Sequence, residues 1–404
     1  MTLSTVCSRC DSSYDRRQQP RCACGEPLWY DSGAADFDWD DCTDDEGLWR
    51  YAPLLPACEP SGLAVAAGGT PLVRSRRLDD VAGCRIWVKD EAEQPTGSYK
   101  DRGSAVALSL ASADETTAVG TVSYGNMAMS TAAHAASVGR DCVVLVPAET
   151  PSVRLELVAQ YDPTIVRVDG DYGALYDDVL ALDPETPVDF FLSDPPARTS
   201  GYKTVVFELA EQFAPDVPDA LALPASSGGF VSGVYQGLLD LETAGLLDEL
   251  PRVYAVQTAA SDPITRAFAR GSDEVTPLDP GEVGDTIAHS IGNPAPPSGN
   301  VVLDAVRETG GAVLSVTDEE IERAQRAFAR RGGFCVEPAS ATPLAGVSRL
   351  AERGDVESAD DVILLPTGTG FKEAGTGKAV DRGAFRVVDR ADVPNRLRAL
   401  VGNE

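Results

Sequence analysis

Beyond residue 70, short runs of Val, Ile and Leu alternate along the chain with longer Ala-rich stretches of helical character. Continuous apolar runs of this length predict buried strands, and the helical stretches between them predict crossovers onto a parallel sheet. We therefore expect an α/β body. The expected strands span residues 85–89, 118–123, 142–147, 164–168, 220–224, 253–257 and 361–366, and the expected helices span 127–137, 153–161, 172–182, 204–213 and 231–244.

The length and net charge of the chain limit its possible domain number and binding partners. The chain has 404 residues, enough for two or three domains, and its 34 Lys and Arg stand against 63 Asp and Glu, a net charge of −29. An acidic surface of this size argues against nucleic acid or an anionic membrane as partner and favours a halophilic source. No apolar run approaches the ~18 residues of a membrane helix, and the start has no signal-peptide pattern. We therefore expect a cytoplasmic protein.

Four of the nine cysteines fall within the first 24 residues, as Cys7-x-x-Cys10 and Cys22-x-Cys24. Paired cysteines on two tight turns can close a tetrahedral thiolate site, and metal binding can fold a segment too short for its own core. We expect residues 1–30 to form a zinc-ribbon-like module with these four thiolates as ligands of a structural zinc ion. The second pair is one residue tighter than usual, so free thiols of a degenerate ribbon are the alternative.

The stretch Pro-Thr-Gly-Ser-Tyr-Lys-Asp-Arg-Gly, residues 95–103, follows the expected strand 85–89. Pro and Gly break the chain there, which places Lys100 on the first turn of a helix. The helix dipole disfavours a cation at this end, so the neutral amine needed for Schiff-base chemistry is easier to reach. Read alone, the stretch fits an ordinary surface lysine better, and Asp101 and Arg102 most simply serve the helix start and local ion pairing.

Three further junctions where an expected strand ends carry small or polar residues, and ligands bind at that edge of an α/β sheet. Asn126 opens an Ala-rich helix, and Thr367 follows the strand at 361–366. A glycine-rich loop after the strand at 220–224 suits a phosphate, although it lacks the Walker and dinucleotide-binding patterns. A helix cap for Asn126 and a plain tight turn for the loop remain open as alternatives. The loop residues are Ser226, Ser227, Gly228, Gly229 and Phe230.

Together these features match what pyridoxal 5′-phosphate requires: an amine for a Schiff base, a donor to the ring oxygen, a phosphate cradle and a partner for the ring nitrogen. The chain has only two histidines, His134 and His289. A histidine metal site or a Ser-His-Asp triad is therefore not favoured.

With these motifs, the chain resembles the fold type II pyridoxal-phosphate enzymes, which are similar to the tryptophan synthase β chain, and most closely the threonine synthase family. The resemblance runs from the ribbon, which also occurs in archaeal members, to about residue 375. It rests on residues 97–103, 123–126, 201–204, 286–294, 337–341 and 367–370.

The resemblance implies two open parallel-sheet domains with the cofactor between them, a large one of residues 31–100 and 205–404 and a small one of residues 101–204. Lys100 would carry the cofactor as a Schiff base, Asn126 would donate to the ring 3′-oxygen, and Thr367 would face the ring nitrogen. The loop at 226–230 would bind the cofactor phosphate. The implied reaction converts O-phospho-L-homoserine and water to L-threonine and phosphate, in a homodimer.

The substrate region departs from the family pattern. Ser123, Ser193 and Arg198 match family contacts to the substrate, but three positions do not match: Met127 stands where a threonine is usual, Leu157 where a lysine is frequent and Leu192 where an asparagine is expected. A lost lysine would remove a charge-assisted contact of roughly 1.5–3 kcal/mol. The neighbouring Arg154 is an alternative source of that charge.

These departures keep open a related lyase that acts on an unphosphorylated amino acid, such as a threonine or serine dehydratase or a diaminopropionate ammonia-lyase. A catalytically idle paralogue is disfavoured, because Lys100, Asn126 and Thr367 are all intact.

Overall fold

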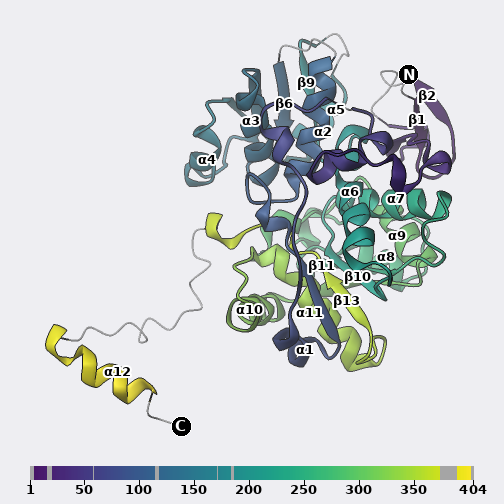
Figure 1. Cartoon of the computed structure of the whole chain (residues 1–404). Coiled ribbons are helices and arrows are strands. Elements are labelled where there is room, and N and C mark those ends of the chain that lie inside the picture. Colours follow the sequence, from purple (N-terminus) through teal and green to yellow (C-terminus); the bar gives the residue numbers. More distant parts are fainter. Residues whose placement is uncertain are drawn as a thin grey trace.

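The computed structural model describes residues 4–15, 21–57, 59–113, 118–170, 172–182, 186–373 and 389–401. They form two α/β bodies, each built on its own sheet, and a small β module that lies against the larger body (Figure 1).

The larger sheet has six strands in the order β12-β11-β10-β13-β5-β4. All neighbours are parallel except β4, which runs antiparallel to β5. The strands are β4 (Leu72–Arg74), β5 (Arg85–Lys89), β10 (Ala220–Pro224), β11 (Arg252–Thr258), β12 (Ala312–Val316) and β13 (Asp361–Leu364).

Helices cover both faces of this sheet, which explains why its strands read as continuous apolar runs. Along β10, Leu221 and Leu223 face one core, and Ala220 and Ala222 face the other. One face carries α7 (Gly229–Thr243), α8 (Pro263–Ala269) and α9 (Gly299–Glu308), and the other carries α1 (Arg76–Ala82), α10 (Asp318–Ala327) and α11 (Pro338–Arg353).

The smaller sheet has four parallel strands in the order β8-β7-β6-β9. They are β6 (Ala118–Val122), β7 (Asp141–Pro147), β8 (Thr164–Val168) and β9 (Val188–Phe190). The core on one face is shared with α2 (Lys100–Ala113), α3 (Asn126–Ser137) and α4 (Ser152–Ala159), and the core on the other with α5 (Tyr172–Leu180).

Helix α6 (Pro196–Phe213) links the two bodies, because Ala197 belongs to the core of the smaller sheet and Tyr202 to that of the larger one. Gly201 allows α2 to approach closely, since a Cβ atom at this position would lie 2.1 Å from the carbonyl oxygen of Arg102. A domain boundary at residue 204 falls inside this helix. The bounds 31–100, 101–204 and 205–404 therefore stay an interpretation of the sequence.

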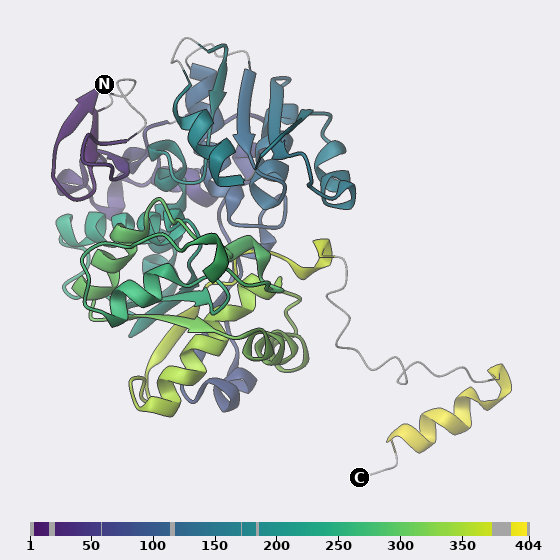
Figure 2. The same cartoon turned by 180° about the vertical axis from the view of Figure 1, so that it is seen from behind.

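The N-terminal module is an antiparallel sheet of order β2-β1-β3, formed by β1 (Ser4–Cys7), β2 (Ser13–Asp15) and β3 (Leu28–Tyr30). It lies beside α7 and α9 of the larger body (Figure 2). Trp29 donates from Nε1 to Ser232 Oγ at 2.9 Å, and Arg9 pairs with Asp304 at 2.7 Å. Short 3-10 turns follow between residues 34 and 66, and α12 (Val393–Val401) ends the described chain.

All seven expected strands are confirmed to within two residues at each end. The expected strands do not include β4, β9 and β12 of the two larger sheets or β1, β2 and β3 of the N-terminal module, and α6 begins eight residues before the helix expected at 204–213. This helix begins at Pro196, where proline is compatible with a first turn because its missing N–H needs no partner there. None of the helices in the described ranges has the length and apolar character needed to span a membrane.

Candidate active site

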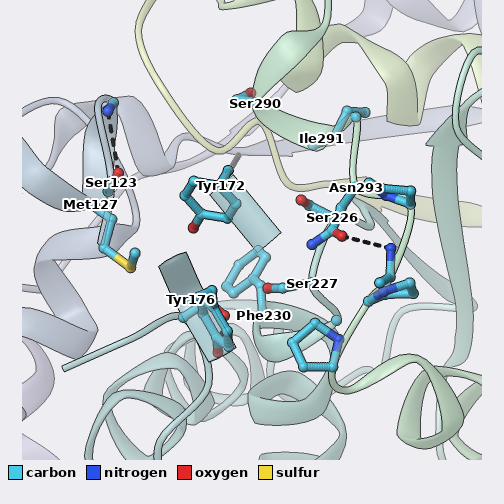
Figure 3. A pocket seen from close by; sticks show the side chains of 18 of the residues that line it. Ser123, Met127, Tyr172, Tyr176, Ser226, Ser227, Phe230, Ser290, Ile291 and Asn293 are labelled. Carbon is cyan, nitrogen blue, oxygen red and sulfur yellow. Dashed lines mark hydrogen bonds between the residues drawn. The ribbon is translucent and has the colours of Figure 1, made fainter. Parts of the chain in front are cut away.

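A cavity of about 780 Å³ lies where four parallel strands lead into loops. Strand β5 leads to Lys100, β6 to Asn126, β10 to the loop at 226–228, and β13 to Thr367. Ser123 and Met127 face the cavity from one side and Ser226 and Asn293 from the other, with aromatic rings between them (Figure 3). The four motifs that the sequence places at strand ends therefore meet in one cavity.

Two backbone hydrogen bonds fix the loop that carries Lys100. The Tyr99 N–H donates to Thr367 O, and the Thr369 N–H donates to Gly97 O, both at 3.0 Å. Gly97 has a φ of 76°, and a Cβ atom there would lie 2.7 Å from the Thr369 side chain. The close pairing of the two loops sets Lys100 beside Thr367 in the cavity wall.

Lys100 opens α2, as the sequence predicts, and its amine lies in an aromatic environment. Nζ is 4.5 Å from the ring centre of Tyr99 and 5.6 Å from that of Tyr202. No side chain or carbonyl in the described ranges accepts a hydrogen bond from this amine. Burial, and secondly the positive charge of Arg198, lower the pKa of Lys100 to about 7. A neutral amine is thus available near neutral pH.

A buried ionic network holds the first turn of α2. Arg102 donates to Glu91 at 2.7 Å and to Glu208 at 2.5 Å, and Lys89 donates to Glu208 at 2.6 Å. Asp101 accepts from the Thr96 N–H at 2.6 Å. These side chains are almost fully buried. The network goes beyond the local ion pairing that the sequence suggests, because Glu208 lies on α6, 106 residues further along the chain than Arg102.

The Asn126 side chain is held at both ends. Its Nδ2 donates to the two carboxylate oxygens of Glu337 at 2.7 and 3.0 Å, and its Oδ1 accepts from Lys372 Nζ at 2.6 Å. It does not cap α3, since the cap position is Gly125 and no side chain caps the helix start. Burial raises the pKa of Glu337 to about 7. Glu337 lies in the family motif at 337–341, for which the sequence predicts no role, and nothing in the sequence relates Lys372 to Asn126.

Thr367 lies in the cavity wall with its hydroxyl group 3.0 Å from Ser340 Oγ. Ser340 Oγ also accepts from the N–H groups of Thr367 and Gly368, at 3.0 and 2.9 Å. The position of Thr367 is therefore set by both its backbone and its side chain.

The loop before α7 presents backbone donors. The first helical bond runs from the Ser232 N–H to Gly228 O at 2.8 Å, and within the described chain no hydrogen bond takes up the N–H groups of residues 226–231. Gly228 has a φ of 89°, and a Cβ atom there would lie 2.6 Å from Ser298 O. Free N–H groups at the positive end of a helix suit a phosphate. Ser226, Ser227, Gly228 and Phe230 line the cavity, whereas Gly229 lies behind it against Ser193.

Of the three residues expected to bind substrate, two line the cavity and one does not. Ser123 and Ser193 line the cavity, with Ser193 Oγ 3.1 Å from the Tyr176 hydroxyl. Arg198 does not line it: the guanidinium is fully buried and donates to Ser104 and Thr131 at 2.9 and 2.7 Å. This arrangement brings its charge, but not its N–H groups, to the cavity.

Of the three departures, Met127 lines the cavity, Leu192 is buried outside its lining, and Leu157 is 38% exposed. The side chain of Arg154 lies outside the described residues.

Several further residues line the cavity without having been predicted from the sequence. Tyr172 and Tyr176 come from α5, and Arg21 comes from the N-terminal module. His289 also lines the cavity, and it differs from these residues because it lies within the 286–294 segment that carries a family motif. The tyrosines and Arg21 had no such signal, since only the folded chain brings them to this site.

The four N-terminal cysteines are confirmed as a cluster, with all four sulfur atoms within 4.8 Å of one another. Three of the Sγ–Sγ distances are 3.5, 3.6 and 3.8 Å. Four thiolates around one zinc ion, with Zn–S bonds near 2.3 Å, would lie about 3.8 Å apart. These three distances are close to that value.

Comparison with known proteins shows which family this chain resembles. Residues 63–368 match the family described as pyridoxal-phosphate dependent enzyme. The threonine synthase of Methanocaldococcus jannaschii is 36% identical over 332 residues, covering 81% of each chain, and that of Methanosarcina acetivorans is 34% identical over 376 residues, covering 92% of this chain and 88% of the other.

Solved structures agree on the fold. A threonine deaminase of T.th. has a TM-score of 0.61 at 27% identity, and serine racemase of Dictyostelium discoideum has 0.62 at 24%, each covering 74% of this chain and 92% of the other. The fold is thus that of the fold type II pyridoxal-phosphate enzymes. The chain belongs to the pyridoxal-phosphate-dependent enzymes and, among these, to the threonine synthase family.

Proposed function

We propose that this protein is a threonine synthase, which converts O-phospho-L-homoserine and water to L-threonine and phosphate. One observation carries the proposal: a desolvated lysine and a phosphate cradle share one cavity, in a chain 36% identical to a threonine synthase along four-fifths of its length.

The residues of the cavity fit pyridoxal 5′-phosphate. Lys100 offers an amine with no hydrogen-bond partner in the described ranges, and the start of α7 offers backbone N–H groups to a phosphate. When bound, the cofactor supplies an electron sink conjugated with the amino nitrogen of the substrate.

Lys100 is suited to two tasks. As a neutral amine it can bind the cofactor covalently, and when the substrate displaces it, Nζ can accept and return a proton at the substrate carbons. Both tasks need the neutral form near neutral pH, which the lowered pKa provides. The rings of Tyr99 and Tyr202 lie next to this amine and provide an apolar surface beside it.

Asn126 and Thr367 would orient the cofactor ring. Glu337 and Lys372 hold the Asn126 amide in one orientation, so its position does not depend on a ligand. Thr367 presents a neutral hydroxyl group, braced by Ser340, which cannot keep a ring nitrogen protonated as a carboxylate would. We assign Asn126 to the ring oxygen and Thr367 to the ring nitrogen.

At the substrate end, we assign the hydroxyl groups of Ser123 and Ser193 to direct contacts. Arg198 would act by its charge from behind the wall, because Nη1 and Nη2 donate to protein oxygens and the guanidinium does not line the cavity.

We also propose that Cys7, Cys10, Cys22 and Cys24 bind a structural zinc ion. The sulfur spacing supports this, and four thiolates leave no open position for a catalytic water. We further expect a homodimer and a salt-tolerant protein, which sedimentation at low and high salt would test.

A substrate comparison tests the function. Purified holoenzyme is assayed for phosphate release from O-phosphohomoserine, and for keto-acid release from threonine and serine. We expect phosphate release to dominate and Lys100→Ala to abolish it together with the visible absorbance of the bound cofactor. Keto-acid formation without phosphate release would instead assign a dehydratase.

A further inference from the structure

The N-terminal module contributes a cation to the cavity wall. Arg21 donates from Nη1 to Gly25 O at 2.8 Å and from Nη2 to the Asp194 carboxylate. Asp194 also accepts from the hydroxyl groups of Tyr176 and Ser298, at 2.8 and 2.7 Å. The module and both α/β bodies therefore meet at one carboxylate, which holds Arg21 in place.

This meeting point lies next to the phosphate cradle. The Ser298 N–H donates to Ser227 O at 2.8 Å. A Cβ atom at Gly228 would lie 2.6 Å from Ser298 O, and one at Gly229 would lie 3.1 Å from the Asp194 side chain. Since Asp194 binds Arg21, the guanidinium is near the start of α7, where the backbone donors are.

The charged residues that line the cavity indicate what kind of ligand Arg21 would bind. Among the described residues that line the cavity, Arg21 and Lys100 are the only Lys or Arg, and Asp177 and Glu337 are acidic. Lys100 is reserved for the cofactor and its amine readily becomes neutral. Arginine keeps its charge at any working pH. A phosphate monoester carries a charge of nearly −2 near pH 7, so a lasting cation favours its entry.

The guanidinium has donors to spare. It carries five N–H groups, and its two contacts within the described residues engage one at Nη1 and one at Nη2. A planar guanidinium can give two parallel hydrogen bonds to phosphate oxygens while Asp194 orients it.

We propose that Arg21, supplied by the cysteine-bearing module, is the cation that a phosphate monoester meets in this cavity. The ester is the cofactor phosphate or the substrate phosphate, and for the substrate the inference rests on the proposed function. Arg21 thereby provides a charge inside the cavity, which position 157 does not line.

The first arm of the test concerns the cofactor. Apoenzyme is titrated with pyridoxal 5′-phosphate and with pyridoxal, which lacks the phosphate, and binding is followed by absorbance. If the ester is the cofactor's, Arg21→Ala weakens binding of pyridoxal 5′-phosphate roughly 10- to 100-fold, as for a charge-assisted contact, and leaves pyridoxal unchanged. Arg21→Lys retains much of the affinity.

The second arm concerns the substrate. If the ester is the substrate's, Arg21→Ala leaves cofactor affinity unchanged. The KM for O-phosphohomoserine and the inhibition constant of inorganic phosphate then rise by the same factor, with less change in kcat.

Arg9→Ala is the matched control. Arg9 also joins the module to the body, through Asp304 and the carbonyl oxygen of Asp273, but does not line the cavity. Zinc content is measured for every variant to show that the module is intact. Equal losses in Arg9→Ala and Arg21→Ala, or losses that affect pyridoxal as much as its phosphate, would overturn the proposal in favour of a docking role.

Unchanged binding in both arms would overturn it as well. If the wild type releases no phosphate from O-phosphohomoserine, the proposed function fails, but the comparison of pyridoxal with its phosphate still tests Arg21.

Discussion

The lowered pKa of Lys100 predicts how fast the apoenzyme captures its cofactor at each pH. Only the neutral amine attacks an aldehyde, so the capture rate follows the neutral fraction. Burial lowers the pKa of Lys100 from 10.5 to about 7. Below pH 7 the rate should therefore rise about tenfold per pH unit, and it should level off between pH 7 and 8.

The size of the effect follows from the two pKa values. At pH 7 an amine with a pKa of 7 is half neutral, whereas one with the ordinary value of 10.5 is neutral in about one molecule in 3,000. The cavity thus raises the reactive fraction about a thousandfold at neutral pH. The surrounding charges oppose one another, since the charge of Arg198 lowers the pKa of Lys100 further and the charges of Asp194 and Glu337 raise it.

Stopped-flow absorbance after mixing apoenzyme with pyridoxal 5′-phosphate measures the rate from pH 5.5 to 10, with N-acetyl-lysine as the unburied reference. Glu337→Gln removes a negative charge near Lys100, so the midpoint should move to lower pH. Asp177→Asn is the control, because Asp177 also lines the cavity but does not contribute to the shift at Lys100.

A midpoint near 10 in the wild type would show that burial does not desolvate this amine. A midpoint that rises in Glu337→Gln would show that the charges around Lys100 do not act as the structure indicates.

Further predictions concern stability, the cradle and the metal. In urea unfolding, Glu208→Gln should lower the free energy of unfolding by about 3–5 kcal/mol, because it leaves the buried Lys89 without its carboxylate and takes one of two carboxylates from Arg102. Glu211→Gln, which breaks a more exposed pair, should cost about 1 kcal/mol or less. The pKa of Glu208 is lowered from 4.5 to about 2, so its contribution is complete above pH 4.5 and is lost as the pH falls toward 2. The wild type should therefore lose more stability than Glu208→Gln over that interval, and parallel losses would contradict the assignment. Gly228→Ala should weaken cofactor binding at least tenfold, since the left-handed backbone alone costs ~1–2 kcal/mol and the new Cβ meets a carbonyl oxygen; Gly245→Ala has the same kind of backbone with open space around it and should bind normally. Cys7→Ser should lose zinc by metal analysis, and unchanged zinc content would refute the four-thiolate site.

The sequence was most informative where chemistry follows directly from a strand. Strands β5, β10 and β13 are continuous apolar runs, and their ends determine where Lys100, the 226–228 loop and Thr367 lie. Parallel strands bring their carboxyl ends to one edge, so the order of strands and loops along the chain is enough to expect these residues to meet.

Contacts between distant segments could not be predicted in this way. Asn126 and Glu337 are 211 residues apart, and neither spacing nor periodicity relates them. Arg198 illustrates a second limit, because its position matches a family contact although the helix that carries it turns the side chain into the interior. Arg21 lies in a segment whose cysteines indicate only a metal site, and docking of the module alone brings it to the cavity.

The Lys-Asp-Arg sequence at the start of α2 shows why the reactive lysine comes with a buried ionic network. Successive helical residues point about 100° apart, so three consecutive side chains must leave in three directions. Lys100 enters the cavity, Asp101 ties the preceding loop through Thr96, and Arg102 enters the ionic core with Glu208. A buried ion pair adds little net stability over an apolar one, because desolvation offsets the attraction. Its gain here is geometric: with Asp101 and Arg102 fixed by several hydrogen bonds each, the helix cannot rotate, and Lys100 is held toward the cofactor site before any ligand arrives.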